Sequence, residues 1–237
     1  MKKGGNSSRI LFITGTDTGV GKTLLTGLLL HHLRGNGVHA LAAKPFCSGG
    51  TQDVVFLNEI QSGELTLRQL NPFYFRDPVA PLVAGRKHNR LVPLPQVLTH
   101  LRKLSADCEV LLVEGSGGLL VPLGEGYSVA DLIAQLGCDV LVAAQNKLGT
   151  INHTLLTVRC LQDLLQAGRK GVKNIKVILM NRGETDQSCS ANGEVLRELL
   201  APVPLLEVPF LGGNACSAIV VKKKCKKIAK TLASIFE

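Results

Sequence analysis

The strongest chemical signal in the sequence is a glycine-rich stretch near its start. Between an apolar run at 10–13 and a segment with helical spacing lies Gly15-Thr16-Asp17-Thr18-Gly19-Val20-Gly21-Lys22-Thr23. Glycines let backbone N–H groups converge on phosphate oxygens, and the start of a helix adds partial positive charge. We therefore expect a nucleotide-binding loop with contacts from Gly19, Val20 and Gly21, although its first glycine lies one residue farther back than in G-x-x-x-x-G-K-T. Lys22 is expected to reach the β- and γ-phosphates, and Thr23 to offer its hydroxyl to Mg²⁺.

A second lysine and two carboxylates follow the next apolar runs. Lys44 comes directly after the run at 40–43, where it would neutralise charge on a transferring phosphoryl group; the alternative is a surface lysine beside a turn. Glu114 ends a later apolar run, and Asp53 lies between the two. Carboxylates beside a phosphate loop are typical Mg²⁺ ligands, so Thr23, Asp53 and Glu114 are expected to form a hard oxygen set. For Asp53 a purely structural role is an equal alternative.

Two further polar segments follow the later apolar runs. The segment at 147–157 has the pattern of a loop that enters a helix, with Thr150 or Asn152 as candidate caps. Exposed N–H groups at that helix start would bind an anion such as a carboxylate. Asn181 and Arg182 come directly after the run at 175–180. An asparagine amide matches the donor and acceptor edge of a purine, although many strands end in asparagine without a function.

Alternating strands and helices are needed to position these motifs. Apolar runs predict strands at 10–13, 40–43, 110–113, 140–143, 175–180 and 205–208. Helical spacing predicts helices at 22–34, 94–104, 129–135, 152–166 and 193–200. This alternation indicates a mostly parallel β-sheet with helices on both faces, whose ligands bind beyond the carboxyl ends of the strands. We therefore predict an α/β fold of the P-loop NTPase-like kind, as a single domain over residues 1–237.

The positive charge of the chain is confined to its two ends. The net charge is +9, but the body at 10–221 carries 18 basic and 17 acidic residues. The surplus lies in two basic terminal segments, 1–9 and 222–237. A nearly neutral body is not typical of a nucleic-acid-binding face, so no nucleic-acid partner is expected. Along the second segment and the residue before it, the spacing of Val221, Cys225, Ile228 and Leu232 predicts a terminal helix with an inward apolar stripe and lysines in water. The alternative is a lysine cluster that binds anionic lipid or nucleic acid.

The cysteines and the hydropathy pattern indicate the compartment. Seven cysteines without a C-x-x-C pair predict free thiols rather than disulfides or a zinc site, as in the reducing cytoplasm. No apolar stretch reaches the roughly 20 residues of a membrane span, and the basic start of the chain lacks the cleavage site of a signal peptide. We expect a cytoplasmic protein without a membrane partner.

Five motifs taken together resemble one family. GTDTGVGKT, KPFCSGG, EGSGGLLVPL, KLGTINHTLLT and MNRG occur in order over roughly residues 10–211 and are similar to dethiobiotin synthetase, the ATP-dependent ligase of biotin synthesis. The resemblance implies that CO₂ adds to one amine of 7,8-diaminopelargonic acid, and that the carbamate attacks the γ-phosphate of MgATP. The second amine would then close a cyclic urea with release of phosphate. Such chemistry needs positioning and charge neutralisation rather than a covalent nucleophile.

The resemblance also implies roles for individual residues. Lys22, Lys44 and Thr18 would be catalytic, Thr18, Lys44 and Ser48 would contact the diamine, and Gly117 and Gly118 would shape the floor of the crevice. Further nucleotide contacts would come from Gly115, Ser116, Gly117, Asn181 and Arg182, with Ala201, Pro202, Val203 and Glu207 nearby on the adenine side.

The quaternary structure follows from the resemblance as well. The family is homodimeric, and its loop matching Leu148, Gly149 and Asn152 reaches across to the substrate carboxylate of the neighbour. The resemblance therefore implies a homodimer with its active site at the interface. Two alternatives remain: an ATP-driven switch of the ParA and MinD kind, which carries a lysine where this chain has Asp17, and a cobyrinate-type amide-forming ligase, which usually has a glutaminase domain in addition.

Overall fold

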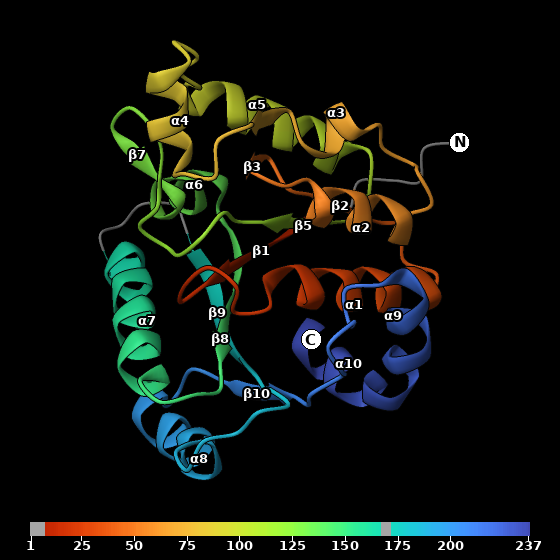
Figure 1. The fold of residues 1–237 in the computed structure, drawn as a ribbon, viewed down its shortest axis with the longest axis vertical. Helices are drawn as coiled ribbons and strands as arrows, with labels where there is room; N and C mark the ends of the chain where they lie inside the picture. Colours follow the sequence, from red (N-terminus) through yellow and green to blue (C-terminus); the bar gives the residue numbers. More distant parts are fainter. Residues whose placement is uncertain (1–7, 167–171) are drawn as a thin grey trace.

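The centre of the protein is a parallel β-sheet. In the computed structural model, which describes residues 8–166 and 172–237, the strand order is β10-β9-β8-β1-β5-β2 (Figure 1). The strands are β1 (Arg9–Gly15), β2 (Ala40–Ala43), β5 (Val110–Glu114), β8 (Cys138–Gln145), β9 (Val172–Met180) and β10 (Leu205–Val208). All six are predicted by their apolar runs. The predicted bounds of β2 and β10 agree with the structure, and the other four strands are longer than predicted.

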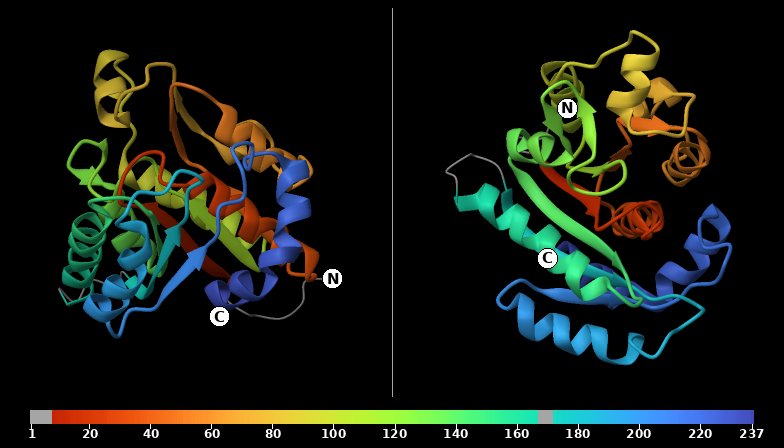
Figure 2. Two further views of the ribbon diagram at one scale, coloured as in Figure 1. Left: turned by 60° about the horizontal axis from the view of Figure 1, so that its bottom comes forward. Right: turned by 60° about the vertical axis from the view of Figure 1, so that its left-hand side comes forward.

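Helices cover both faces of this sheet, as predicted (Figure 2). The five predicted helices are α1 (Lys22–Gly35), α5 (Leu94–Ala106), α6 (Val129–Leu136), α7 (Thr150–Gln166) and α8 (Cys189–Leu200). In Figure 1 the C-terminal helices α9 (Ala218–Cys225) and α10 (Ala229–Phe236) lie beside α1, and both contact it. The sheet is therefore enclosed, which is why its strands are continuous apolar runs rather than alternating ones.

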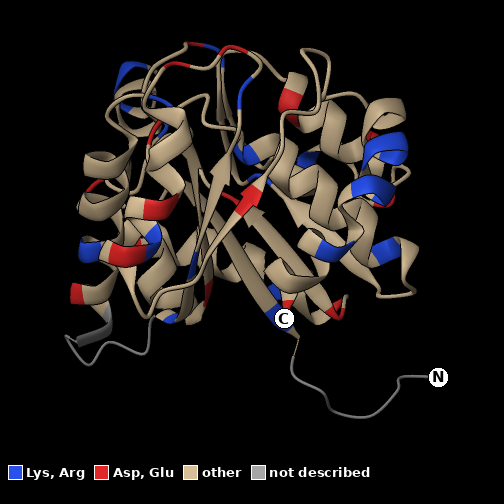
Figure 3. Ribbon diagram, turned by 90° about the horizontal axis from the view of Figure 1, so that it is seen from below, with Lys and Arg blue, Asp and Glu red and all other residues tan. Residues whose placement is uncertain are grey.

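The C-terminal basic segment packs as its apolar spacing predicts. Val221, Cys225, Ile228 and Leu232 are all buried. The segment is not one helix, because a short 3₁₀ turn (Lys226–Ile228) separates α9 from α10. Its lysines are exposed apart from Lys224, which is half-buried, and blue segments gather on the right in Figure 3, where α9 lies. Most of the N-terminal basic segment, residues 1–7, lies outside the described residues.

Several short elements that the sequence analysis did not predict lie close to the motifs. Strand β3 (Phe46–Ser48) pairs with β4 (Phe73–Phe75) and holds the chain that follows Lys44. Helix α2 (Gln52–Ile60) carries Asp53 in its first turn. The remaining short elements are α3 (Leu67–Leu70), α4 (Pro81–Lys87), β6 (Pro122–Gly124) and β7 (Tyr127–Ser128).

Two expectations about the environment of the chain can be compared with the structure. All seven cysteines are free thiols, as predicted. Across residues 8–166 and 172–237, no helix is long and apolar enough to cross a membrane.

Candidate active site

The glycine-rich stretch forms a loop between β1 and α1. Gly21, which precedes the first residue of α1, has a φ of 104°, a left-handed conformation that glycine adopts without steric strain. Gly15 ends β1, and a Cβ atom there would lie 2.7 Å from a methyl group of Val20. The displaced first glycine therefore has a packing role in this loop.

Lys22 lies across the inner side of this loop. Its Nζ donates a hydrogen bond to the backbone oxygen of Asp17 at 2.8 Å. Burial lowers the pKa of Lys22 to about 8, although the nearby Glu114 carboxylate acts in the opposite direction. Together with the start of α1, this ammonium group offers positive charge to an anion.

Four of the predicted residues meet at the carboxyl edge of the sheet. Lys44 follows β2, Glu114 ends the neighbouring strand β5, and Lys44 Nζ forms an ion pair with Glu114 Oε1. The same Nζ lies 2.9 Å from Asp53 Oδ2. Thr23 Oγ1 donates to Glu114 Oε1 at 2.7 Å. The structure thus brings the second lysine and the predicted hard oxygen set into one cluster.

The charge state of this cluster follows from its burial. Glu114 is fully buried and Lys44 is nearly so. Burial disfavours the Lys44 ammonium, but the Glu114 and Asp53 carboxylates outweigh it and raise the pKa of Lys44. Glu114 Oε2 is buried without a hydrogen-bond partner. The cluster therefore combines an ammonium group held by two carboxylates with a buried acceptor, Glu114 Oε2, that has no partner.

A cavity of about 490 Å³ opens beside the cluster. Among the residues predicted to contact the diamine, Thr18, Lys44 and Ser48 line it, together with Gly117. Apolar side chains from a segment the sequence analysis did not assign to the site complete its wall, namely Pro78, Val79, Ala80 and Pro81.

Residues of the glycine turn after β5 line two neighbouring cavities. Gly115 is buried directly behind Glu114, and the Ser116 hydroxyl donates to the backbone oxygen of Phe46 at 2.7 Å, which ties this turn to β3. Gly118 does not line the 490 Å³ cavity. It lines a neighbouring cavity of about 440 Å³ with Thr16 and residues of α7. Both glycines lie against the phosphate loop, since a Cβ atom would stand 3.5 Å from Thr18 Oγ1 at Gly117 and 3.5 Å from the Thr16 backbone oxygen at Gly118. That they shape the floor of one crevice stays a prediction.

A third cavity, of about 450 Å³, lies along the phosphate loop at the ends of β9 and β10. Its walls include Gly19, Val20, Gly21, Asn181 and Arg182, as predicted for the nucleotide side, and also Pro209, Phe210 and Leu211. The last three belong to none of the predicted motifs, although they follow the predicted strand at 205–208. Glu207, inside β10, accepts a hydrogen bond from Asn181 Nδ2 at 3.3 Å and so lies next to this pocket.

The structure does not bring Ala201, Pro202 and Val203 to this pocket, so that prediction is wrong. These residues precede β10, which runs parallel to β9 with Leu205 beside Val177. They therefore lie toward the amino edge of the sheet, whereas Asn181 follows the carboxyl end of β9.

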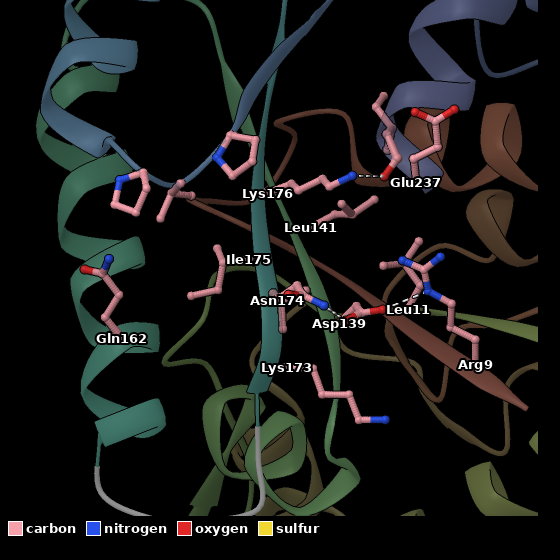
Figure 4. Close-up of a pocket in the computed structure, with 15 residues that line it drawn as sticks. Arg9, Leu11, Asp139, Leu141, Gln162, Lys173, Asn174, Ile175, Lys176 and Glu237 are labelled. Carbon is pink, nitrogen blue, oxygen red and sulfur yellow. Dashed lines mark hydrogen bonds and ion pairs between the residues drawn. The ribbon is translucent and has the colours of Figure 1, made fainter. Parts of the chain in front are cut away.

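Pro202 and Val203 line a different cavity, of about 360 Å³, which Figure 4 shows in close-up. There Arg9 Nε lies 2.8 Å from Asp139 Oδ2, and Asn174 Nδ2 donates to the other oxygen of Asp139 at 2.8 Å. Lys176 Nζ donates to the backbone oxygen of Ile235 at 3.2 Å, close to the end of α10. These polar groups bind one another and the C-terminal helix, away from the phosphate loop.

The loop that precedes α7 is exposed. Leu148 is 77% exposed, Gly149 has a φ of 87°, and Asn152 is exposed in the first turn of α7. Helix α7 begins at Thr150, whose hydroxyl has no hydrogen-bond partner. The prediction of Thr150 or Asn152 as a helix cap is therefore wrong. The Thr150 hydroxyl accepts no hydrogen bond from the first turn, and Asn152 already lies inside the helix.

A parallel sheet with a glycine-rich loop and a buried lysine between its central strand and a helix defines a P-loop nucleotide-binding protein. A family model described as an AAA domain matches residues 9–210. The ATP-dependent dethiobiotin synthetase BioD of Anaeromyxobacter dehalogenans is 40% identical over 207 residues, which cover 85% of this chain and 90% of the relative. That of Bacillus subtilis (strain 168) is 35% identical over 206 residues, which cover 84% and 86%. The chain belongs to the dethiobiotin synthetase family.

A solved structure shows the same fold in a distant protein. The septum site-determining protein MinD of Pyrococcus horikoshii, complexed with Mg-ADP, superposes with a TM-score of 0.63 over 96% of each chain. Its sequence is only 15% identical, so this likeness concerns the fold alone.

Proposed function

We propose that this chain converts 7,8-diaminopelargonic acid, CO₂ and ATP to dethiobiotin, ADP and phosphate. One amine takes up CO₂ as a carbamate, and a carbamate oxygen attacks the γ-phosphorus of ATP. The second amine then attacks the carbonyl carbon of the mixed anhydride, closes the cyclic urea and releases phosphate. The observation that carries this proposal is the position of Lys44, between the phosphate loop and the 490 Å³ cavity, where two reactants would meet.

The two lysines would stabilise the transferring phosphoryl group by charge. Lys22 stands at the start of α1 and would contact the β- and γ-phosphates. Lys44 forms part of the cavity wall, and the adjacent Glu114 and Asp53 carboxylates raise its pKa. It would therefore act as a fixed cation rather than as a proton donor, in a buried site where charge is poorly screened.

The residues around Glu114 fit a magnesium ion. A hydroxyl from Thr23 and carboxylates from Asp53 and Glu114 are the hard oxygen ligands that Mg²⁺ prefers. Glu114 Oε2 is a buried acceptor without a partner, beside the Thr23 hydroxyl that contacts Oε1. We propose that these three residues hold Mg²⁺, which would offset the charge of the ATP phosphates when bound.

The 490 Å³ cavity would hold the diamine. Ser48 Oγ is buried there without a hydrogen-bond partner and is free to contact an amine or a carbamate. Thr18 lines the same cavity from the phosphate loop. Val79, Pro81 and Val121 supply apolar surface that suits the alkyl chain of the substrate.

The base of ATP would lie in the 450 Å³ pocket. Asn181 offers an amide to the base edge, and Phe210, which is 51% exposed, offers an aromatic face. Arg182 lines the same pocket. This arrangement would leave the triphosphate to run along the glycine-rich loop toward Lys44.

We further propose that a second copy of the chain covers the face around Leu148. Leu148, Leu120 and Leu156 are 77%, 68% and 59% exposed, and the last two line the 440 Å³ cavity beside Gly118. Exposed apolar side chains gathered on one face favour a protein interface. Leu148, Gly149 and Asn152 would then contribute to the substrate carboxylate site of the neighbour.

A cytoplasmic location is part of the proposal. The seven free thiols fit a reducing compartment. Neither nucleic acid nor membrane is assigned as a partner, because the apolar stripe of the C-terminal segment (Val221, Cys225, Ile228 and Leu232) is buried in the protein and so offers nothing to a membrane, and the body of the chain is nearly neutral.

The function is tested by following ADP formation by the purified protein. We expect turnover only when the diamine and bicarbonate are both present. Lys44→Gln is expected to abolish it, while Lys223→Gln, which removes an exposed lysine, is expected to leave it unchanged. ATP turnover that is indifferent to the diamine would refute the ligase and favour the ATP-driven switch.

A further inference from the structure

A chain of three asparagine amides runs along the carboxyl edge of the sheet behind the base pocket. Asn146 follows β8, Asn181 follows β9, and Asn192 lies on α8. Asn192 Nδ2 donates to Asn146 Oδ1 at 2.9 Å, and Asn146 Nδ2 donates to Asn181 Oδ1 at 2.7 Å. Asn146 and Asn192 are 4% and 3% exposed, so the amides are linked away from water.

The directions of the first two amides are fixed by groups that can only accept hydrogen bonds. Asn192 Nδ2 also donates to the backbone oxygen of Lys147 at 3.2 Å. Asn146 Nδ2 also donates to the backbone oxygen of Cys189 at 3.1 Å. Because a carbonyl oxygen cannot donate, turning either amide by 180° would place two acceptors face to face. Asn146 must therefore present its NH₂ group to Asn181.

Asn181 is consequently held from both sides. Its Oδ1 faces the NH₂ group of Asn146, and its Nδ2 donates to Glu207 Oε2 at 3.3 Å. Glu207 is itself held by an ion pair with Arg197. A carboxylate also only accepts, so both neighbours require the same orientation of the Asn181 amide. Of the three asparagines, Asn181 is the one that lines the 450 Å³ pocket.

We propose that Asn146 and Asn192 are positioning residues that make the site select adenine over guanine. The inference rests on the proposed function, which places the base in this pocket. Asn181 retains one acceptor site on Oδ1 and one N–H on Nδ2. Adenine offers an amino donor beside a ring-nitrogen acceptor, whereas guanine offers O6 as an acceptor beside an N–H donor. An Asn181 amide in one fixed orientation pairs with adenine, but with guanine it sets its oxygen against O6 and its N–H against the N–H of the base. An amide that turns freely can pair with either base.

The test is the ratio of kcat/KM for ATP to kcat/KM for GTP, measured with the diamine and bicarbonate present. In Asn146→Asp the introduced carboxylate can only accept, so it competes with Glu207 for the NH₂ group of Asn181, and either orientation of the amide then meets one acceptor with its oxygen. The Asn181 amide is therefore expected to lose its single fixed orientation. We expect the ATP-to-GTP ratio to fall at least about tenfold, the scale of discrimination by one paired base contact. Asn192→Leu removes the donor to Asn146 Oδ1 and leaves the Cys189 backbone oxygen to orient the Asn146 amide, so we expect a smaller fall in the same direction.

Two further variants make the outcomes distinguishable. Asn174→Asp makes the same chemical change on β9 at the opposite edge, where Asn174 donates to Asp139, and should leave the ratio unchanged. Asn181→Ala should abolish the preference. The positioning role is overturned if Asn181→Ala abolishes the preference for ATP while Asn146→Asp and Asn192→Leu keep the native ratio. It is also overturned if those two variants lower kcat/KM equally for ATP and GTP. If Asn181→Ala has no effect on the ratio, the proposed base site itself fails. Should Asn146→Asp not fold, Asn192→Leu carries the test.

Discussion

At the scale of single residues, the two lysines of the site have opposite electrostatic environments. Lys22 is buried with its Nζ on a backbone oxygen, and burial lowers its pKa to about 8. Lys44 is equally buried but stands between Glu114 and Asp53, which raise its pKa. The positive charge of Lys22 therefore needs a bound phosphate to stabilise it, whereas the positive charge of Lys44 is already stabilised by the carboxylates of the protein.

Lys44→Met should expose the dependence of Glu114 on its partner. Removing one member of a buried ion pair leaves an uncompensated charge, so we expect the free energy of unfolding to fall by about 3 kcal/mol. Lys44→Met with Glu114→Gln removes both charges and should regain most of the stability but none of the activity. Urea denaturation measures the first quantity and ADP release the second. Equal stability of the single and double variants would contradict the pairing.

Lys22 should make nucleotide binding depend on pH. Its pKa in the folded protein is about 8, below the ordinary 10.5, so its charge is lost as the pH rises through about 8. Nucleotide phosphates favour the charged form, so binding at about pH 9 should take up close to one proton, and affinity should fall above pH 8. Calorimetry in buffers of different ionisation enthalpy measures this uptake. Its persistence in Lys22→Met, or its absence from the native protein, would show that another group is responsible.

At the scale of elements, the sequence is informative where a strand is long or a helix is amphipathic. The strands at 40–43 and 205–208 were predicted with their bounds, because polar residues, His39 and Lys44, flank the first and prolines, Pro204 and Pro209, flank the second. Strands β3 and β4 have three residues each, which is too short for a period to be visible. Helix α2 was missed because its apolar residues are nearly continuous, so the pattern lacks a clear helical face.

The site residues that directly follow a predicted strand could be identified from the sequence. Lys44 and Glu114 both follow apolar runs, and carboxyl ends of parallel strands meet at one edge. The two side chains are in contact because β2 and β5 are neighbours in the sheet. Neither motif predicts this strand order. Ala201–Val203 were chosen from a family resemblance. Because ligands bind beyond the carboxyl ends of parallel strands, the residues after β10, Pro209 and Phe210, were the better candidates.

That correction has a direct test in a pair of matched truncations. Phe210→Ala removes an aromatic face from the 450 Å³ pocket and should raise the KM for ATP about tenfold, since one stacked base contributes about 1–3 kcal/mol. Val203→Ala, at the amino edge, should leave that KM unchanged. Steady-state kinetics at saturating diamine separate the two. The reverse pattern would restore the original assignment of Val203 to the base.

At the scale of the whole molecule, the exposed lysines of the C-terminal segment and the exposed leucines beside α7 lie on different elements. The body is nearly neutral, and exposed lysines gather on α9 and the segment after it (Figure 3). Leu148, Leu120 and Leu156 are 77%, 68% and 59% exposed and lie in the loop before α7, the glycine turn after β5 and α7 itself. The face proposed to meet a second copy is therefore an apolar one.

Mixing two inactive variants should reveal whether each site is shared between copies. Lys44→Gln disables the phosphoryl site, and Asn152→Ala disables the proposed carboxylate contact. If the loop of one copy serves the site of the other, a mixed dimer has one intact site, and random mixing should restore about a quarter of the native activity. If the loop serves its own chain, every site in the mixture is defective and no activity returns.

The most direct test of the central claim is the fate of the carbon atom of bicarbonate. With ¹³C-bicarbonate, ATP and the diamine, we expect a cyclic urea that carries the label at its carbonyl carbon, with one ADP formed for each molecule of product. Mass spectrometry of the product and simultaneous ADP quantification give both values. ADP formation without a labelled product would contradict the account.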